Sequence, residues 1–318
     1  MPAVARKTAA RARPAPPRPD APPSWLLRFL RQLYQPGVLF PTALALAAIV
    51  TWPYLPAWTP DLSVDPAYQV TAERLQLPAA HQWIPHNFRG RVLRRAGGTS
   101  EQPLSLLRDG LSERLAESLA AEPWVREVTR VELHRDGVIA VDLTFRRPVL
   151  MVSTARGMYA VDETGVLLPP EDFRAEDIRQ FPLARQPQSL PNVPAGQVWN
   201  DAGVQQAAHL AAALFPTGSS SDPWRSLELA AILIPSAAAQ EGTQGPLTFE
   251  ILTAGGSRIL WGHAPGTDSL EPSTEQKLAR LVYYREQCGG FETAQGPTRI
   301  DIRDIKVIYA GSLDEERR

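Results

Sequence analysis

The chain has almost no cysteine: Cys288 is the only one among 318 residues. A single thiol excludes an intrachain disulfide and any metal site built on several cysteines. Stability must therefore come from buried apolar side chains. The stretch from Asp61 to Arg318 is long enough for two modest domains with cores of their own.

Patterns typical of an enzyme are also missing. The histidines form neither an HExxH motif nor a short metal-ligand pair on one helix face. The sequence contains no glycine-rich phosphate loop and no serine in a nucleophile elbow. We therefore expect no catalytic residue, no cofactor, no metal ion and no small-molecule substrate. A formal net charge of -1 also argues against nucleic acid as a partner.

Charge is absent between Gln32 and Pro60. The centre of this run, Val38 to Leu55, is apolar and predicts a membrane-spanning helix. Basic residues precede the run and acids follow it, which predicts a cytoplasmic N-terminus. We expect residues 1–31 to be a disordered basic cytoplasmic tail with an interfacial helix, residues 32–60 a transmembrane segment, and the remainder extracytoplasmic. The protein would then be single-pass in the cell inner membrane, with a buried core helix or a cleaved signal peptide as the alternatives.

The most regular pattern lies between Arg108 and Phe145. Leucines at helical spacing predict a helix over Arg108–Ala121. Alternating apolar residues then predict two strands around Asp136-Gly137, a dipeptide typical of a tight hairpin turn. We expect the helix to lie on the apolar face of this hairpin.

A second set of elements follows. Strands are expected over Arg147–Ser153, Met158–Leu168, Leu227–Ile234, Leu247–Thr253, Ser257–Trp261 and Thr298–Ala310. Helices are expected after a cap at Asn200 or Asp201 and after a capping box at Ser273 and Gln276. The proline-rich segment Phe173–Gly196 is expected to be mostly irregular. In the last strand the alternation slips near Asp304, which indicates a bulge or a bend.

A set of motifs occurs along the chain in a fixed order. Its residues are Pro123, Trp124, Val125, Pro148, Val149, Val161, Asp162, Gly165, Asp301, Ile302 and Arg303. These motifs resemble those of the FtsQ/DivIB family of bacterial cell division proteins, and the likeness extends over about Gln32 to Gly311. The chain departs from the family pattern at Leu133–Gly137 and at Asp304, where many members have tyrosine. The resemblance is therefore to a divergent member.

The resemblance implies an α+β fold with a single N-terminal transmembrane helix. A POTRA-like domain over 66–146 would place helices on a small mixed sheet, and Pro123, Trp124 and Val125 would form its structural motif. An FtsQ-like β domain over 147–311 would contain an antiparallel sheet and two helices, followed by a C-terminal tail over 312–318.

The resemblance also implies a function. FtsQ-like proteins are non-enzymatic divisome scaffolds at the division septum, and they hold an FtsB-type protein, itself paired with an FtsL-type protein, along their final strand. FtsW/FtsI-type proteins are further candidate partners. The expected partner-binding residues here are Arg299, Asp301, Arg303, Ile305, Lys306, Val307 and Tyr309.

Alternatives remain open for two features. Charged side chains on the last strand can simply blunt a sheet edge, although the resemblance favours binding. Trp124 can anchor a partner, although its place at a helix–strand junction favours a core role. The second function considered is a POTRA-bearing factor in envelope protein assembly or secretion. Such proteins usually repeat the domain, whereas this chain shows one copy.

Overall fold

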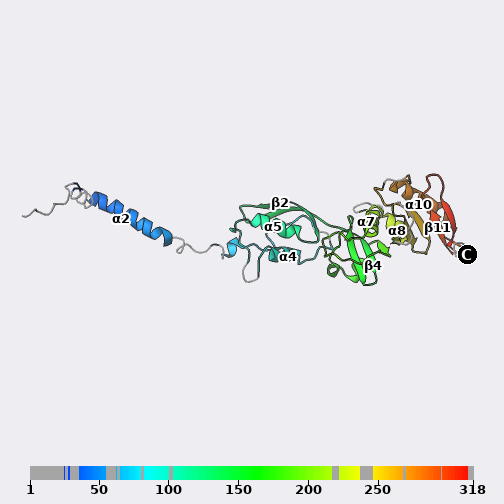
Figure 1. Cartoon of the computed structure of the whole chain (residues 1–318), viewed down its shortest axis with the longest axis horizontal. Helices are drawn as coiled ribbons and strands as arrows, with labels where there is room; N and C mark the ends of the chain where they lie inside the picture. Colours follow the sequence, from blue (N-terminus) through cyan, green and yellow to red (C-terminus); the bar gives the residue numbers. More distant parts are fainter. Residues whose placement is uncertain are drawn as a thin grey trace, which may run out of the picture. The chain divides into compact units, whose positions relative to one another are not determined.

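The computed structural model describes most of the chain (Figure 1). Its described parts are Trp25, Arg28, Leu62 and residues 36–54, 65–79, 82–99, 103–216, 222–236, 246–267, 270–294 and 296–313. The chain divides into two units, Met1–Asp61 and Leu62–Arg318. Most of the predicted N-terminal tail and interfacial helix, and most of the predicted C-terminal tail, lie outside the described residues.

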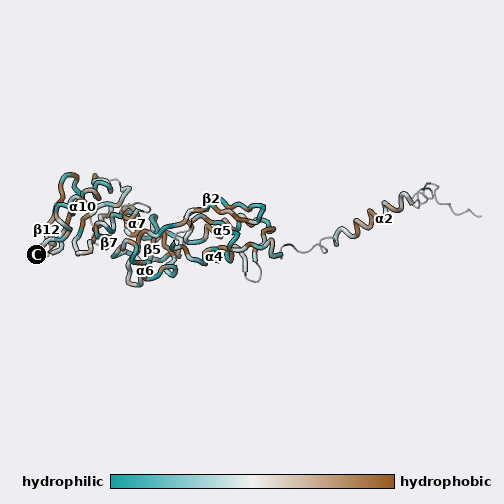
Figure 2. Tube along the Cα trace, turned by 180° about the vertical axis from the view of Figure 1, so that it is seen from behind, coloured by the Kyte–Doolittle hydropathy of each residue, from teal (hydrophilic) through white to brown (hydrophobic). Residues whose placement is uncertain are grey.

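The first unit contains the helix α2 (Pro36–Thr51), followed by a short 3-10 turn, η1 (Trp52–Tyr54). The predicted membrane-spanning helix over Val38–Leu55 is contradicted. No helix among the described residues is both long and apolar enough to cross a bilayer. α2 has 16 residues, which corresponds to about 24 Å, whereas a hydrocarbon core is about 30 Å thick. The helix ends before Pro53, because proline has no N–H to donate to the carbonyl oxygen of Ile49 and cannot extend the α-helical hydrogen-bond ladder. The hydropathy colouring of the Cα trace in Figure 2 shows that α2 is mainly apolar.

The second unit begins with a small mixed sheet. Its strands are β1 (Leu75–Gln76), β2 (Val125–Leu133) and β3 (Ile139–Phe145), in the order β1-β3-β2. β3 pairs parallel with β1 and antiparallel with β2. The predicted hairpin turn is confirmed, because Gly137 adopts a positive φ of 80° between these strands. The predicted helix is confirmed as α5 (Leu111–Ala120), and a second helix is α4 (Phe88–Arg95).

The core of this part continues past Arg146. The buried residues of α4, α5 and the three strands form one cluster, and the same cluster includes Met151, Ala160, Leu168 and Phe181. The small sheet therefore shares its apolar core with the segment that follows it.

The remaining strands form a nine-stranded sheet. They are β4 (Pro148–Thr154), β5 (Gly157–Asp162), β6 (Leu183–Arg185), β7 (Leu229–Leu233), β8 (Phe249–Thr253), β9 (Arg258–Gly262), β10 (Glu292–Thr293), β11 (Gly296–Asp301) and β12 (Tyr309–Ser312). The order is β10-β11-β9-β8-β7-β6-β4-β5, with β12 paired to β11. The helical elements are η4 (Pro170–Asp172), α6 (Ala175–Ile178), α7 (Ala202–Leu214), α8 (Pro223–Ser226) and α10 (Thr274–Cys288).

The prediction of an antiparallel sheet with two helices is therefore wrong. β6 pairs parallel with both β4 and β7, and β11 pairs parallel with β9. Parallel neighbours need crossover connections, and α7 and α10 lie on two of these connections. β6 falls in the segment that was expected to be mostly irregular. Its three residues are too few to show an alternating pattern, although Ala184 is fully buried.

The two long helices of this part begin where the sequence predicts. Asp201 caps α7 by accepting hydrogen bonds from the N–H groups of Gly203 (2.9 Å) and Val204 (3.2 Å). α10 begins with the predicted capping box of Ser273 and Gln276. Local side-chain chemistry therefore determines both helix starts.

A buried carboxylate joins the end of the small sheet to the start of the large one. Asp162 is 2% exposed. Its Oδ1 accepts hydrogen bonds from the N–H groups of Thr164 and Val166, both at 2.9 Å. Its Oδ2 lies 2.7 Å from Nη1 of Arg146. A buried charge that is held in this way is costly to leave unpaired.

We expect the Asp162→Ala substitution to lower the free energy of unfolding by about 3–5 kcal/mol, because it leaves the Arg146 guanidinium buried without its partner. Urea unfolding of the full chain, followed by tryptophan fluorescence, measures the change. Glu163→Ala is the matched control. Glu163 pairs with Arg126 at the surface, where its side chain is 47% exposed, and its loss should cost less than about 1 kcal/mol. Equal urea midpoints for the two variants would contradict the role of Asp162.

Candidate functional site

The seven residues predicted to bind a partner lie in a C-terminal hairpin and not in one strand. Arg299 and Asp301 belong to β11, and Tyr309 belongs to β12. The segment between these strands contains the other four: Arg303, Ile305, Lys306 and Val307. The prediction of one continuous strand over Thr298–Ala310 is therefore wrong.

The chain reverses because Asp304 closes a turn. Its Oδ1 accepts hydrogen bonds from the backbone N–H groups of Lys306 (2.7 Å) and Val307 (3.1 Å). These bonds also hold the pKa of the Asp304 carboxyl below its usual range. Aspartate side chains that bind the backbone a few residues further on favour turns. The slip in alternation at Asp304 thus marks a bend, as predicted, and this bend belongs to a complete reversal of the chain.

This reversal makes β11 an interior strand. β11 pairs with β9 on one side and with β12 on the other. Its backbone groups over residues 298–301 are therefore occupied within the sheet, and an added strand cannot pair there.

β12 is the outer strand at this end of the sheet. In the described part of the chain, it pairs only with β11. All four of its residues are exposed. An outer strand of this kind presents backbone groups to which another chain can add a strand.

The open side of β12 follows from the hydrogen bonds of β11. Thr298 and Ile302 direct their N–H groups to the β9 side, 2.9 Å from Oγ of Ser257 and 3.4 Å from O of Leu260. Successive residues of a strand point to alternating sides, so the odd-numbered residues of β11 face β12. Their register partners in β12 are also odd-numbered. Ala310 therefore directs its N–H and C=O to the open side.

The two faces of this part of the sheet differ in chemistry. One face is apolar and covered, and its aligned residues on β7, β8, β9 and β11 are the fully buried Ile232, Ile251, Ile259 and Ile300. The opposite face presents charged side chains from β8, β9 and β11, namely Glu250, Arg258, Arg299 and Asp301. An open groove on that charged face runs beside β12.

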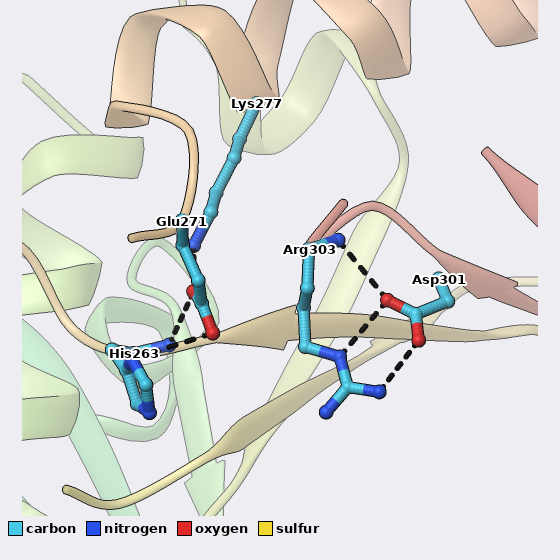
Figure 3. Close-up of polar contacts among 5 residues, drawn as sticks. All are labelled: His263, Glu271, Lys277, Asp301 and Arg303. Atoms are coloured by element: carbon cyan, nitrogen blue, oxygen red, sulfur yellow. Dashed lines mark hydrogen bonds and ion pairs between the residues drawn. The ribbon is translucent and has the colours of Figure 1, made fainter. Parts of the chain in front are cut away.

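An ion pair fixes the start of the segment between the two strands. Arg303 donates from Nε and Nη2 to the two oxygens of Asp301, at 2.9 and 2.6 Å, as Figure 3 shows. The hydrogen bond from Arg303 lowers the pKa of Asp301 and raises the pKa of Arg303. Such a two-bond pair holds the guanidinium in one orientation.

Glu250 links two further arginines on the charged face. Its carboxylate lies 3.4 Å from Nη1 of Arg258 and 3.5 Å from Nη2 of Arg299. With Arg303, three guanidinium groups stand beside the carboxylates of Glu250 and Asp301. The described side chains around the groove therefore have an excess of positive charge.

Sequence reasoning missed the contacts that α10 makes with this hairpin. Arg280 donates one hydrogen bond to the carbonyl oxygen of Asp304 and another, at 2.6 Å, to that of Val307. An arginine within a helix gives no sequence signal for such contacts, because only the tertiary structure brings α10 beside the turn.

A second cluster near the start of α10 was also missed. Lys277 is 3% exposed, and its Nζ lies 2.5 Å from Oε2 of Glu271. The same carboxylate accepts a hydrogen bond from the backbone N–H of His263 at 3.0 Å, as Figure 3 shows. The Lys277 ammonium also lies 5.3 Å from the ring centroid of Trp261. This cluster anchors α10 to the end of β9.

Trp124 has the core role that the sequence favoured. It is fully buried, and its Nε1–H donates to Oδ2 of Asp172 at 2.7 Å. Val125 is buried at the start of β2, and Pro123 lies in the preceding turn. Asp172, at the end of η4, also pairs with Arg91 at 3.2 Å and so joins two segments.

Among the residues that the structure describes, no group of three or more histidine, cysteine, aspartate or glutamate side chains could hold a metal ion. Cys288 is exposed at the end of α10.

We predict that Arg303→Gln raises the pKa of the Asp301 carboxyl toward its ordinary value of 3.8, because the hydrogen bond from the Arg303 side chain is the main cause that lowers it. In the unchanged protein, the pKa of Asp301 in the folded state lies below 3.8. The Asp301–Arg303 pair therefore stabilises the fold above about pH 3.8. This contribution is lost as the pH falls through the folded-state pKa of Asp301. Carboxyl carbon NMR titration measures the shift. Arg258→Gln is the control, because Arg258 contacts Glu250 instead. A pKa that is the same in both variants would contradict the assignment.

Comparisons with known proteins add no family assignment: no protein-family model matches the chain, and no curated protein matches it significantly.

Proposed function

We propose that this chain is a non-enzymatic scaffold that binds a partner protein by accepting a strand of that partner at the free edge of β12. One observation carries the proposal: Ala310 directs its backbone N–H and C=O away from β11, on an exposed strand with no second neighbour among the described residues. Strand addition at such an edge derives affinity from backbone hydrogen bonds and specificity from alternate side chains.

The partner that we propose is an FtsB-type protein paired with an FtsL-type protein. The support is the resemblance of the chain's motifs to those of the FtsQ/DivIB family, whose members hold this partner along the final strand. β12 is the last strand described here. A place at the division septum and contacts with FtsW/FtsI-type proteins stay predictions.

The side chains around the edge are suited to an extended segment that contains acidic and apolar residues. Tyr309 is 58% exposed on β12, and Ile305 and Val307 are exposed in the preceding segment. The arginines of the neighbouring groove would face carboxylates of the added segment. Charge complementarity of this kind contributes mainly to specificity and association rate.

We predict that Ala310→Pro abolishes partner binding and leaves the fold intact. Proline removes the N–H that faces the open side, and it is tolerated on an outer strand where that N–H is not needed by the sheet. The measurement is co-purification of the full chain with the FtsB-type protein of the same genome. A deletion of residues 299–318 is less informative, because it would also remove β11 and the buried Ile300.

Ala310→Val is the matched control for that experiment. Valine keeps the backbone N–H and favours the extended conformation, so recovery of the partner should equal that of the unchanged chain. The urea midpoints of both variants establish that each is folded. Full recovery with a folded Ala310→Pro variant would exclude strand addition at this edge.

A further inference from the structure

The middle of the segment between β11 and β12 has little apolar burial, although Ile308 at its end is partly buried against the core. Ile305 is 67% exposed and Val307 is 44% exposed, whereas Ile302 at the start is fully buried. The four residues of β12 are exposed as well. A short outer strand is marginally stable by itself, and in a hairpin its register depends on the geometry of the turn.

Polar contacts hold this turn from two sides. Asp304 accepts hydrogen bonds from two backbone N–H groups inside the turn. Arg280, from α10, donates to two backbone carbonyl oxygens of the same turn, those of Asp304 and Val307. The planar guanidinium presents its donors in a rigid fork, so both acceptors are held in one geometry.

α10 is a rigid support for the Arg280 side chain. Leu281, the next residue, is fully buried in the core. One turn earlier, Lys277 is held by the Glu271 carboxylate at 2.5 Å, and the capping box of Ser273 and Gln276 fixes the helix start. Because α10 is held in place, the hydrogen bonds from Arg280 restrict the turn more than hydrogen bonds from a residue in a loop would.

We propose that Arg280 is a positioning residue that pre-organises β12 for strand addition. It fixes the turn after β11, so the backbone of Ala310 is already extended and aligned before a partner arrives. This inference rests on the proposed function. Binding to a pre-ordered strand costs less conformational entropy than binding to a loose one, and loss of the contact should therefore weaken partner binding.

Hydrogen exchange of the full chain tests the positioning role without any partner. We expect Arg280→Ala to speed amide exchange in peptides that cover residues 309–312 by about tenfold, since charge-assisted hydrogen bonds of this kind are among the stronger ones. Peptides from β8 and the urea midpoint should remain unchanged, which a general loss of stability would not allow. Arg280→Lys keeps the charge but not the fork, so its exchange rates should lie between those of the other two proteins.

Arg285→Ala is the matched control on the same helix. Arg285 also makes two contacts, with the carbonyl oxygen of Ser226 and, at 2.5 Å, with the Glu228 carboxylate. These contacts lie away from the C-terminal hairpin, so exchange over residues 309–312 should not change. Equal exchange there in the Arg280 and Arg285 variants would overturn the positioning role.

Photo-crosslinking from position 310 in cells then links the positioning role to binding. We expect Arg280→Ala to lower the yield of the crosslink to the FtsB-type protein by about tenfold, and Arg285→Ala to leave it unchanged. Faster exchange with an undiminished yield would overturn the role in binding. If the unchanged chain gives no such crosslink, the proposed function fails, and the exchange experiment still decides whether Arg280 orders β12.

Discussion

Burial of one face of the nine-stranded sheet is the constraint on which the C-terminal half of the protein depends. Aligned isoleucines on β7, β8, β9 and β11 form a continuous apolar row that is fully buried. Side chains alternate along a strand, so a slip of one residue in β11 would place Arg299 and Asp301 in that core. The register of β11 is therefore fixed, and the charged residues gather on the opposite face.

The parallel pairing of β9 with β11 depends on α10. A parallel neighbour requires a crossover, and α10 provides it between the end of β9 and the start of β10. The same crossover brings Lys277 to the end of β9 and Arg280 to the turn before β12. The α10 crossover thus allows β11 to lie inside the sheet. It also provides Arg280, which holds the turn between β11 and β12.

The small sheet and the large sheet are joined by shared apolar residues and by charged groups. Residues on both sides of Arg146 belong to one cluster. Trp124 donates to Asp172, and Arg146 pairs with Asp162, so each side contributes to these contacts. Because these groups are buried, relative movement of the two parts would expose unpaired polar groups at a considerable free-energy cost.

The amino-acid sequence by itself determined the elements whose causes are local. The Asp136-Gly137 turn, the Asp201 cap, the capping box of Ser273 and Gln276 and the burial of Trp124 all follow from neighbouring residues. The length of α2 was missed although its cause is local, since Pro53 lies within the run that was expected to be helical. Only the tertiary structure decided the rest: that β6 enters the sheet, that β11 is enclosed and β12 open, and that Arg280 reaches the turn. These features depend on which distant segments pair and pack. The local sequence pattern of a short strand, or of an arginine in a helix, is the same whatever lies beside it in the fold.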